Sequence, residues 1–471
     1  MDRGHVGRIK LNLEGVLYSY YRMKKFVAVL LVVAVAFSSL FAGGSADNSS
    51  SSDGTYPKGE LLIWSTGQPQ FRAPFYQEFL DRQGDAAKDV TLHVETIPTM
   101  ADGQQRVIMY SMAGDKDSLP EVIMLDTVGL MALAKAGLLL DQTDYYTPQA
   151  DLYLDGSIDD AVVDGGIYGL QDSVRPQLLF YNAKIFEEYD VDPAMMTTFD
   201  GYIEAGRLLK ERSNGEVYLS WVDTTNYTWR YWGRRGLMPQ AGARIWDEKG
   251  NVVIGEDEGT KLALGFLDQL YSEGLLYRTA MMQPPIYEAT DSGKIATFYI
   301  GAFWDEFLRK NLTATIGDWR VMNAPVFEEV GTGGAPVSNY FCLVDTGTNE
   351  YESLIQDMWY DWQNNSEAIK DRVNILVEQN GPYSNPVSKA ALEDPFWQAP
   401  EPFYGGQSFR KAEADGLENA SKNMMVTQQD AEADIIISAE IEKYVAGEQT
   451  MEQAIANMDK ELKLKIGRAD V

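Results

Sequence analysis

The chain has very few of the side chains on which most catalytic and metal sites are built. Its 471 residues include one cysteine and two histidines. A single cysteine, Cys342, excludes an internal disulfide. His5 lies upstream of the predicted signal peptide, so only His93, in an alternating strand-like stretch, is left for acid–base or metal chemistry. Ser-His-Asp and Cys-His mechanisms and transition-metal clusters lack their side chains. We predict no catalytic residue, no metal and no cofactor.

Positive charge is also scarce. There are 40 lysines and arginines against 70 aspartates and glutamates, which gives a formal net charge of −30. Nucleic-acid binding needs clustered basic side chains that neutralise phosphates, so the composition argues against it. The sequence contains no GxxxxGK[ST] motif and no strand-linked GxGxxG motif. We predict no nucleic-acid partner and no nucleotide cofactor.

One apolar run near the N-terminus is too short for a membrane span. Two lysines, Lys24 and Lys25, precede the apolar residues 26–37, and small residues follow at 42–46. This pattern is typical of a secretory signal peptide over 23–46, and residues 1–22 are interpreted as lying upstream of the true precursor. No cysteine lies near the cleavage site for lipid attachment. We expect an exported periplasmic protein without stable membrane insertion.

What the chain does have is aromatic and apolar residues in regular order. After a Ser-rich flexible tether at 47–58, a short apolar strand at 60–66 is followed by a helical pattern near 70–83. A second strand at 90–97, a helix and a third strand at 121–125 continue the series. The order β-α-β-α-β predicts a mostly parallel sheet with helices on its faces.

The segment 164–190 separates two compact bodies. A turn and the apolar residues 167–170 lead into the polar connector 171–176, and the apolar strand 177–182 then starts a new element. We interpret this segment as the seam between two lobes.

Aromatic side chains stand beside polar ones at several strand ends. Sugars have apolar C–H faces and a rim of hydroxyls, so stacking rings combined with Asp, Asn, Arg or Gln suit them. Trp64 and Asp126 follow the first and third strands, where open α/β sheets place ligands. Tyr227, Trp229 and Trp232 follow the seam. A pair of carboxylates could instead support glycoside hydrolysis, which needs no histidine.

Motifs in a fixed order run through nearly all of the mature chain. They are Leu61–Trp64, Gly114…Pro120-Glu121-Val122-Ile123, Ala134–Leu139, Tyr168-Gly169-Leu170, Tyr181-Asn182…Phe186, Thr197–Asp200, Leu267-Asp268…Gly274-Leu275, Gly293–Ala296 with Gly301–Trp304, and Val445–Thr450…Ala454. As an ordered set they resemble the extracellular solute-binding proteins of ABC importers, and within that family the carbohydrate-binding branch that includes the maltose-binding protein.

The resemblance implies an α/β fold of two lobes, the type II periplasmic-binding-protein fold. Three crossing segments form its hinge and fall near 171–177, 321–327 and 381–386. Lobe one would hold 59–171 plus 327–380, and lobe two would hold 172–326 plus 381–466.

The resemblance also implies that ligand lies between the lobes. The residues carried over as ligand-binding are Trp64, Asp126, Arg175, Asn226, Tyr227, Trp229, Phe303, Trp304, Tyr383 and Tyr404. The implied function is capture of a sugar or oligosaccharide and its delivery to the transmembrane subunits of an ABC permease, by a monomer that is not an enzyme. A secreted glycoside-active enzyme, or the same fold with a peptide, polyamine or organic anion, are the alternatives.

Overall fold

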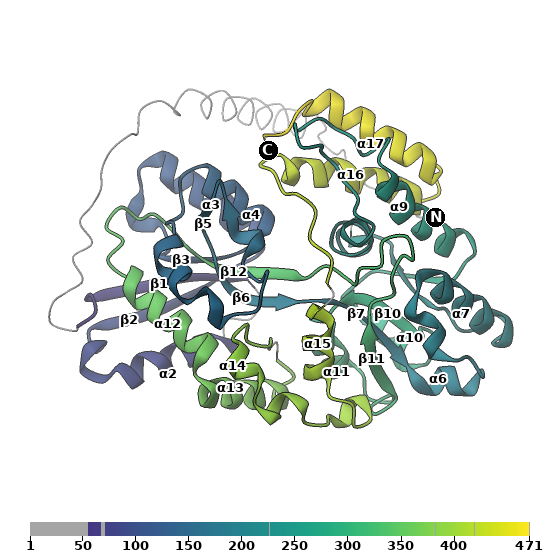
Figure 1. Cartoon of the computed structure of the whole chain (residues 1–471), viewed down its shortest axis with the longest axis horizontal. Coiled ribbons are helices and arrows are strands. Elements are labelled where there is room, and N and C mark those ends of the chain that lie inside the picture. The colour runs from purple at the N-terminus through teal and green to yellow at the C-terminus, as the bar shows by residue number, and fades with distance from the viewer. Residues whose placement is uncertain (1–54, 67–70, 226, 382, 419, 471) are drawn as a thin grey trace, which may run out of the picture. The chain divides into compact units, whose positions relative to one another are not determined.

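Two β-sheets organise the part of the chain that a computed structural model describes, namely residues 55–66, 71–225, 227–381, 383–418 and 420–470 (Figure 1). The predicted signal peptide and most of the tether lie outside these residues. The strands are β1 (Gly59–Thr66), β2 (Val90–Ile97), β3 (Val122–Asp126), β4 (Val162–Val163), β5 (Gly166–Ile167), β6 (Leu170–Arg175), β7 (Gln177–Asn182), β8 (Ser220–Asp223), β9 (Leu276–Thr279), β10 (Thr297–Gly301), β11 (Trp319–Asn323) and β12 (Val337–Leu343).

Helices surround both sheets. The α-helices are α2 (Ala73–Gln83), α3 (Met100–Ala113), α4 (Thr127–Lys135), α5 (Thr143–Tyr146), α6 (Ala183–Glu188), α7 (Phe199–Arg212), α8 (Met238–Gln240), α9 (Glu258–Ser272), α10 (Pro284–Asp291), α11 (Trp304–Asn311), α12 (Glu352–Asn364), α13 (Ser366–Glu378), α14 (Lys389–Leu392), α15 (Phe409–Glu418), α16 (Asp430–Val445) and α17 (Met451–Lys465). A π-helical segment, η7 (Trp229–Leu237), follows β8, and short 3₁₀ turns join several elements.

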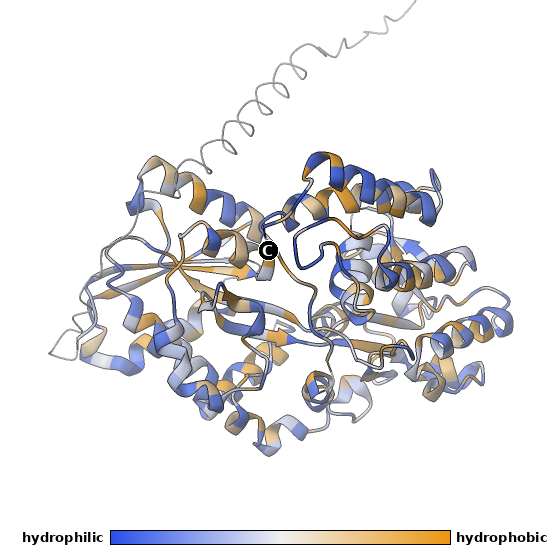
Figure 2. Ribbon diagram, turned by 45° about the horizontal axis from the view of Figure 1, so that its top comes forward, coloured by the Kyte–Doolittle hydropathy of each residue, from blue (hydrophilic) through white to orange (hydrophobic). Residues whose placement is uncertain are grey.

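The first sheet has the strand order β2-β1-β3-β12-β6. β1 pairs in parallel with β2 and β3, as predicted, whereas β12 runs antiparallel to β3 and β6. Side chains alternate along β12: Phe341 and Leu343 pack with α2 and α12, while Tyr340 and Cys342 pack with α3 and α4 on the other face. Helices cover both faces of the sheet, and its central strands β1, β3 and β12 are largely apolar, whereas the edge strands β2 and β6 carry polar side chains (Figures 1 and 2).

The second sheet has the strand order β10-β7-β11, and both neighbours run antiparallel to β7. Its core includes the fully buried Phe180, Phe298 and Trp319. The parallel pair β8 and β9 lies beside this sheet, through a bridge between Tyr218 and Ile295. This body provides η7 and α16, which are used below.

The chain passes from the first sheet to the second within one residue. β6 ends at Arg175 and β7 begins at Gln177, with Pro176 between them. The segment between β11 and β12 returns to the first sheet, and a third crossing follows α13. The predicted two-lobed α/β fold with three crossings is therefore confirmed.

Candidate functional site

A cavity of about 770 Å³ lies where β1 and β3 end and β12 begins. Thr66 and Asp126 are the last residues of the two parallel strands, and Ser338 lies near the start of the antiparallel β12, so all three meet at one edge of the sheet. The opposite wall consists of η7 and α16 from the second body. Open α/β sheets bind ligands at this edge, beyond the carboxyl ends of parallel strands.

Two helices begin at this edge of the sheet. The hydroxyl of Thr99 accepts a hydrogen bond from the amide of Asp102 at the start of α3. The carboxylate of Asp126 accepts one from the amide of Gly129 at the start of α4, at 3.1 Å. Residues from both first turns line the cavity. Such termini carry partial positive charge and offer donors to an oxygen-rich ligand.

The cavity is more basic than the protein as a whole. Its charged lining residues are three arginines, Arg230, Arg234 and Arg235, and two aspartates, Asp126 and Asp434. All three arginines come from η7. In a chain of net charge −30, this local excess of cations is a specific feature of the site.

The arginines are held by acids from two different elements. Arg234 pairs with the buried Asp430 of α16 and lies 3.8 Å from Asp434. Nη2 of Arg235 lies 3.3 Å from the carboxylate of Asp126, which joins the second body to the first across the cavity. The site therefore presents preoriented donors and acceptors on both walls.

Burial changes the ionisation of two of these groups. Loss of solvent raises the pKa of Asp434, although Arg234 acts in the opposite direction. Burial and the adjacent charge of Arg230 lower the pKa of Arg235. Asp434 also accepts a hydrogen bond from the indole Nε1 of Trp229 at 2.8 Å, so this carboxylate fixes one of the site's aromatic rings.

Of the residues predicted to bind ligand, Asp126 and Trp229 line this cavity. Trp64 is only 2% exposed, and its ring packs near Tyr110 and Arg106. Tyr227 is partly buried, with its ring 5.6 Å from that of Tyr231. Asn226 lies outside the described residues.

Arg175, Tyr383 and Tyr404 lie in a buried network beside the crossings. Nε of Arg175 is 2.6 Å from the carboxylate of Glu413 on α15, and its other nitrogens donate to the carbonyls of Tyr383 and Ala302. The hydroxyl of Tyr404 donates to Asp305, and burial raises the tyrosine's pKa. None of these three predicted residues lines the cavities described here.

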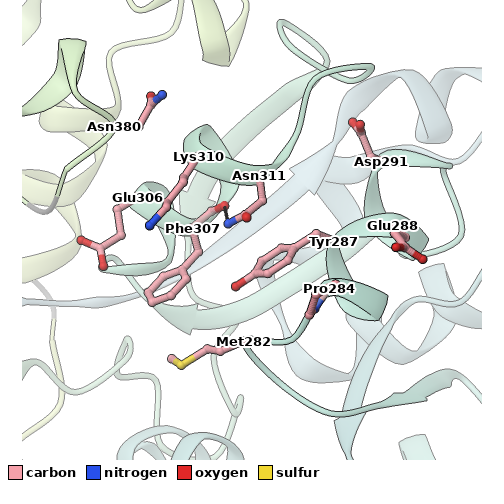
Figure 3. A pocket seen from close by; sticks show the side chains of 10 residues that line it. All are labelled: Met282, Pro284, Tyr287, Glu288, Asp291, Glu306, Phe307, Lys310, Asn311 and Asn380. Carbon is pink, nitrogen blue, oxygen red and sulfur yellow. Dashed lines mark hydrogen bonds between the residues drawn. The ribbon is translucent and has the colours of Figure 1, made fainter. Parts of the chain in front are cut away.

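A second cavity of about 480 Å³ lies between α10 and α11 (Figure 3). Tyr287 and Phe307 supply aromatic faces, Met282 lies below them, and Glu306 and Lys310 stand at one side. The predicted residues Phe303 and Trp304 border it. Trp304 is fully buried, with its ring 5.0 Å from Phe307 and 6.0 Å from Tyr287, and Phe303 is 6.3 Å from Phe307.

Asp126 was predicted, whereas the arginine pair Arg234 and Arg235 and their acids on α16, Asp430 and Asp434, were not. The predicted aromatic stretch ends at Trp232, before both arginines. Asp434 lies on a helix that carries several other charges, so no local pattern distinguishes it. Tyr287 and Phe307 were not predicted either.

The described residues were also considered for a metal site and for a membrane-spanning helix. They contain no group of three or more His, Cys, Asp or Glu side chains placed to hold a metal ion. Within the same residues, every helix is too short or too polar to cross a membrane.

The architecture and the cavity define a two-lobed α/β binding protein of type II. Residues 64–350 match the family of bacterial extracellular solute-binding proteins. Because this match covers more than half of the sequence, the chain belongs to that family.

Two curated relatives resemble part of the chain. The arabinooligosaccharide-binding protein of Halalkalibacterium halodurans is 26% identical over 227 residues, which is 46% of this chain and 48% of the relative. The arabinooligosaccharide-binding protein of Bacillus subtilis is 20% identical over 244 residues, 51% of this chain and 53% of the relative. The matched region thus spans about half the length of these relatives.

Solved structures resemble the chain over most of its length. The sugar-binding protein MalE from Xanthomonas citri has a TM-score of 0.70 at 18% identity, covering 86% of this chain and 97% of that one. The ABC-transporter-associated binding protein from B. animalis subsp. lactis, in complex with β-1,6-galactobiose, has a TM-score of 0.69 at 19% identity, with the same coverage. At this identity the likeness establishes the fold.

Proposed function

We propose that the protein is the substrate-binding component of an ABC importer and captures a sugar or oligosaccharide in the cavity between its two bodies. The observation that carries the proposal is the cavity itself. It lies at the ligand-binding edge of the first sheet, and its opposite wall includes Trp229, a lining residue that is 3% exposed, with arginines and carboxylates around it. Hydroxyl-rich rings with apolar faces fit such a wall.

Family membership supports binding rather than catalysis. The family is one of solute-binding proteins, and the relatives that match half of the chain are named for arabinooligosaccharides. We take arabinooligosaccharides as the first substrate class to test. Glycoside hydrolysis is the competing hypothesis, and it predicts release of reducing sugar.

We assign ligand contact first to Asp126, Trp229 and Tyr227 among the predicted residues, and we add Arg235 and Asp434. Asp126 and Arg235 meet from opposite walls, so a ligand between them would contact both bodies. The other predicted residues within the described part of the chain, Trp64, Arg175, Phe303, Trp304, Tyr383 and Tyr404, would shape or support the site, and Asn226 stays a predicted ligand-binding residue.

The two bodies would close by hinge motion at the three crossings, and the closed form would be the one that a permease recognises. We propose 59–171 plus 327–380 and 172–326 plus 381–466 as the moving parts, with the first boundary shifted to Pro176 because β6 (Leu170–Arg175) belongs to the first sheet. Export through the predicted signal peptide to the periplasm, action as a monomer, and transmembrane permease subunits as partners belong to the same proposal.

Thermal stability in the presence of sugars tests this function. A panel of arabino-, malto- and galacto-oligosaccharides is added to the purified protein, and one class should raise the melting temperature, because ligand binds only the folded state. Arg235→Ala should remove that rise. Arg207→Ala, an exposed arginine paired with Glu273, serves as the control and should leave it unchanged. No rise with any sugar, or release of reducing ends, would contradict the proposal.

A further inference from the structure

We propose that the groove between α10 and α11 is a second saccharide-binding site, which holds the far end of an oligosaccharide whose other end lies in the cavity at the strand ends. The inference rests on the proposed sugar-binding function and extends it, since it specifies a substrate longer than a disaccharide. The volume of the groove, about 480 Å³, lies in the usual range for small-molecule sites.

The groove has the composition of a sugar site. Tyr287 and Phe307 are both partly exposed and present ring faces to the opening, and Met282 adds an apolar floor (Figure 3). The side chains of Glu306 and Asn311 bring carboxylate and amide oxygens to the same opening. Flat apolar faces with hydrogen-bonding groups at their edges suit a saccharide ring better than a purely apolar ligand.

Trp304 fixes these rings from below. It is fully buried and nearly parallel to both rings, with interplanar angles of 23° to Tyr287 and 22° to Phe307. Two partly exposed aromatic side chains are therefore held flat in advance, which reduces the entropy lost when a ligand stacks on them.

A row of rings joins the groove to the wall of the first cavity. The ring centroids of Phe307 and Phe303 are 6.3 Å apart, and those of Phe303 and Tyr231 are 5.7 Å apart. Tyr231 directly follows the cavity residue Arg230 in η7. Tyr227 extends the row by a further 5.6 Å. Tyr231 is only 6% exposed, whereas Phe303 and Tyr227 are partly exposed, so a ligand that spans the two cavities would contact the latter two rings.

The groove also opens at the boundary between the two bodies. Asn380 lines it and immediately precedes the third crossing. At Gly381 an added Cβ would stand 3.0 Å from the ring of Phe71, just before α2 of the first body. A ligand in the groove would thus remain between the moving parts.

One acid of the groove, Glu306, is suited to hydroxyl groups. Burial raises the pKa of Glu306 to about 7, with Arg175 acting in the opposite direction. Near neutral pH its carboxyl group is therefore present in both forms, and it can donate a hydrogen bond as well as accept one.

Calorimetric titration with arabinooligosaccharides of two, four and six units tests the inference. The unsubstituted protein should bind the six-unit sugar more tightly than the two-unit sugar. Tyr287→Ala should weaken binding of the six-unit sugar about tenfold and change binding of the two-unit sugar less than about twofold.

Phe307→Leu is a second variant that keeps an apolar side chain against Trp304 but removes the flat ring. Like Tyr287→Ala, it should weaken binding of the six-unit sugar more than binding of the two-unit sugar. Tyr360→Ala removes a 45%-exposed tyrosine of α12 that lines neither cavity, and it should change nothing. Melting temperatures confirm that each variant is folded.

The outcomes separate the two proposals. Equal affinity of the unsubstituted protein for short and long sugars, or equal losses for both lengths in the variants, would overturn the second site and leave the proposed function standing. If no arabino-, malto- or galacto-oligosaccharide binds the unsubstituted protein, the proposed function itself is overturned.

Discussion

The two cavities differ in how they would hold a sugar. The cavity at the strand ends is lined by three arginines and two aspartates, with Trp229 fixed by one of the acids. The α10–α11 groove is lined by stacked rings together with three acids, Glu288, Asp291 and Glu306, and one exposed lysine; it has no arginine, and none of these acids is paired with that lysine in an ion pair among the described residues. Paired charges orient hydroxyls specifically, whereas stacked rings add affinity with little dependence on the sugar's stereochemistry.

This difference indicates that the two cavities have different roles in binding. The charged cavity would select the sugar and join the two bodies, and the aromatic groove would respond to chain length.

The largest effect should come from the charged cavity, because its ion pairs are buried. Arg234→Ala removes the partner of Asp430, whose side chain is fully buried. A buried charge without its partner destabilises a protein by about 3–5 kcal/mol. Urea unfolding measures the loss, and the exposed Arg207→Ala should lose less than about 1 kcal/mol. Similar small losses for both variants would show that the cavity's charges are solvated.

Arg235→Ala should weaken binding of short and long sugars alike. Loss of a charge-assisted hydrogen bond amounts to about 1.5–3 kcal/mol, or roughly tenfold to more than a hundredfold in affinity. Titration with the two-unit and six-unit sugars checks this. A loss confined to the longer sugar would mean that Arg235, like the groove, affects the dependence of affinity on chain length and does not select the sugar.

The groove should respond to pH through Glu306. Its pKa is about 7 in the folded protein, above the ordinary value of 4.5, so the folded state binds more protons than the unfolded state between these values. Stability should therefore fall as pH rises from about 4.5 to 7. Glu401, whose pKa burial also raises to about 7, adds to the same trend.

Melting temperatures at pH 5 and pH 8 measure this trend. Glu306→Gln should reduce the difference between them, and Glu288→Gln, an exposed acid of the same groove, should not. If both variants keep the full difference, the trend arises elsewhere.

The smallest effect should come from Lys310→Ala. This lysine is exposed at the groove, and no ion pair involving it is found among the described residues. Binding of the six-unit sugar should change by less than about 1 kcal/mol, as calorimetry would show. A loss as large as that of Arg235→Ala would mean that the groove also relies on charge.

Local sequence signals predicted much of the fold. The alternation and apolar runs that located β1, β2 and β3 are local properties, and the structure confirms their parallel order. Thr450 and Gln453 have the spacing of a capping box and form one at the start of α17. Gly274 has a φ of +64° just after α9, the left-handed conformation that favours glycine at a helix end.

The site was less predictable because it depends on a segment with unusual geometry. η7 is π-helical, so its side chains do not follow the ordinary helical period. A Cβ at Gly233 would lie 2.4 Å from the ring of Trp229, which therefore packs against the glycine backbone. Which aromatic residue faces the cavity follows from that contact, and no local pattern encodes it.

The isolated thiol of Cys342 makes the protein suitable for site-specific labelling. Cys342 is the chain's one cysteine and is fully buried on β12, and burial raises its pKa well above the ordinary value. The native protein should thus react slowly with maleimide dyes. Fluorophores attached through Met109→Cys on α3 and Leu464→Cys on α17, both highly exposed, would report the distance between the bodies. The scaffold could then serve as an optical sensor of its own ligand without prior removal of a native thiol.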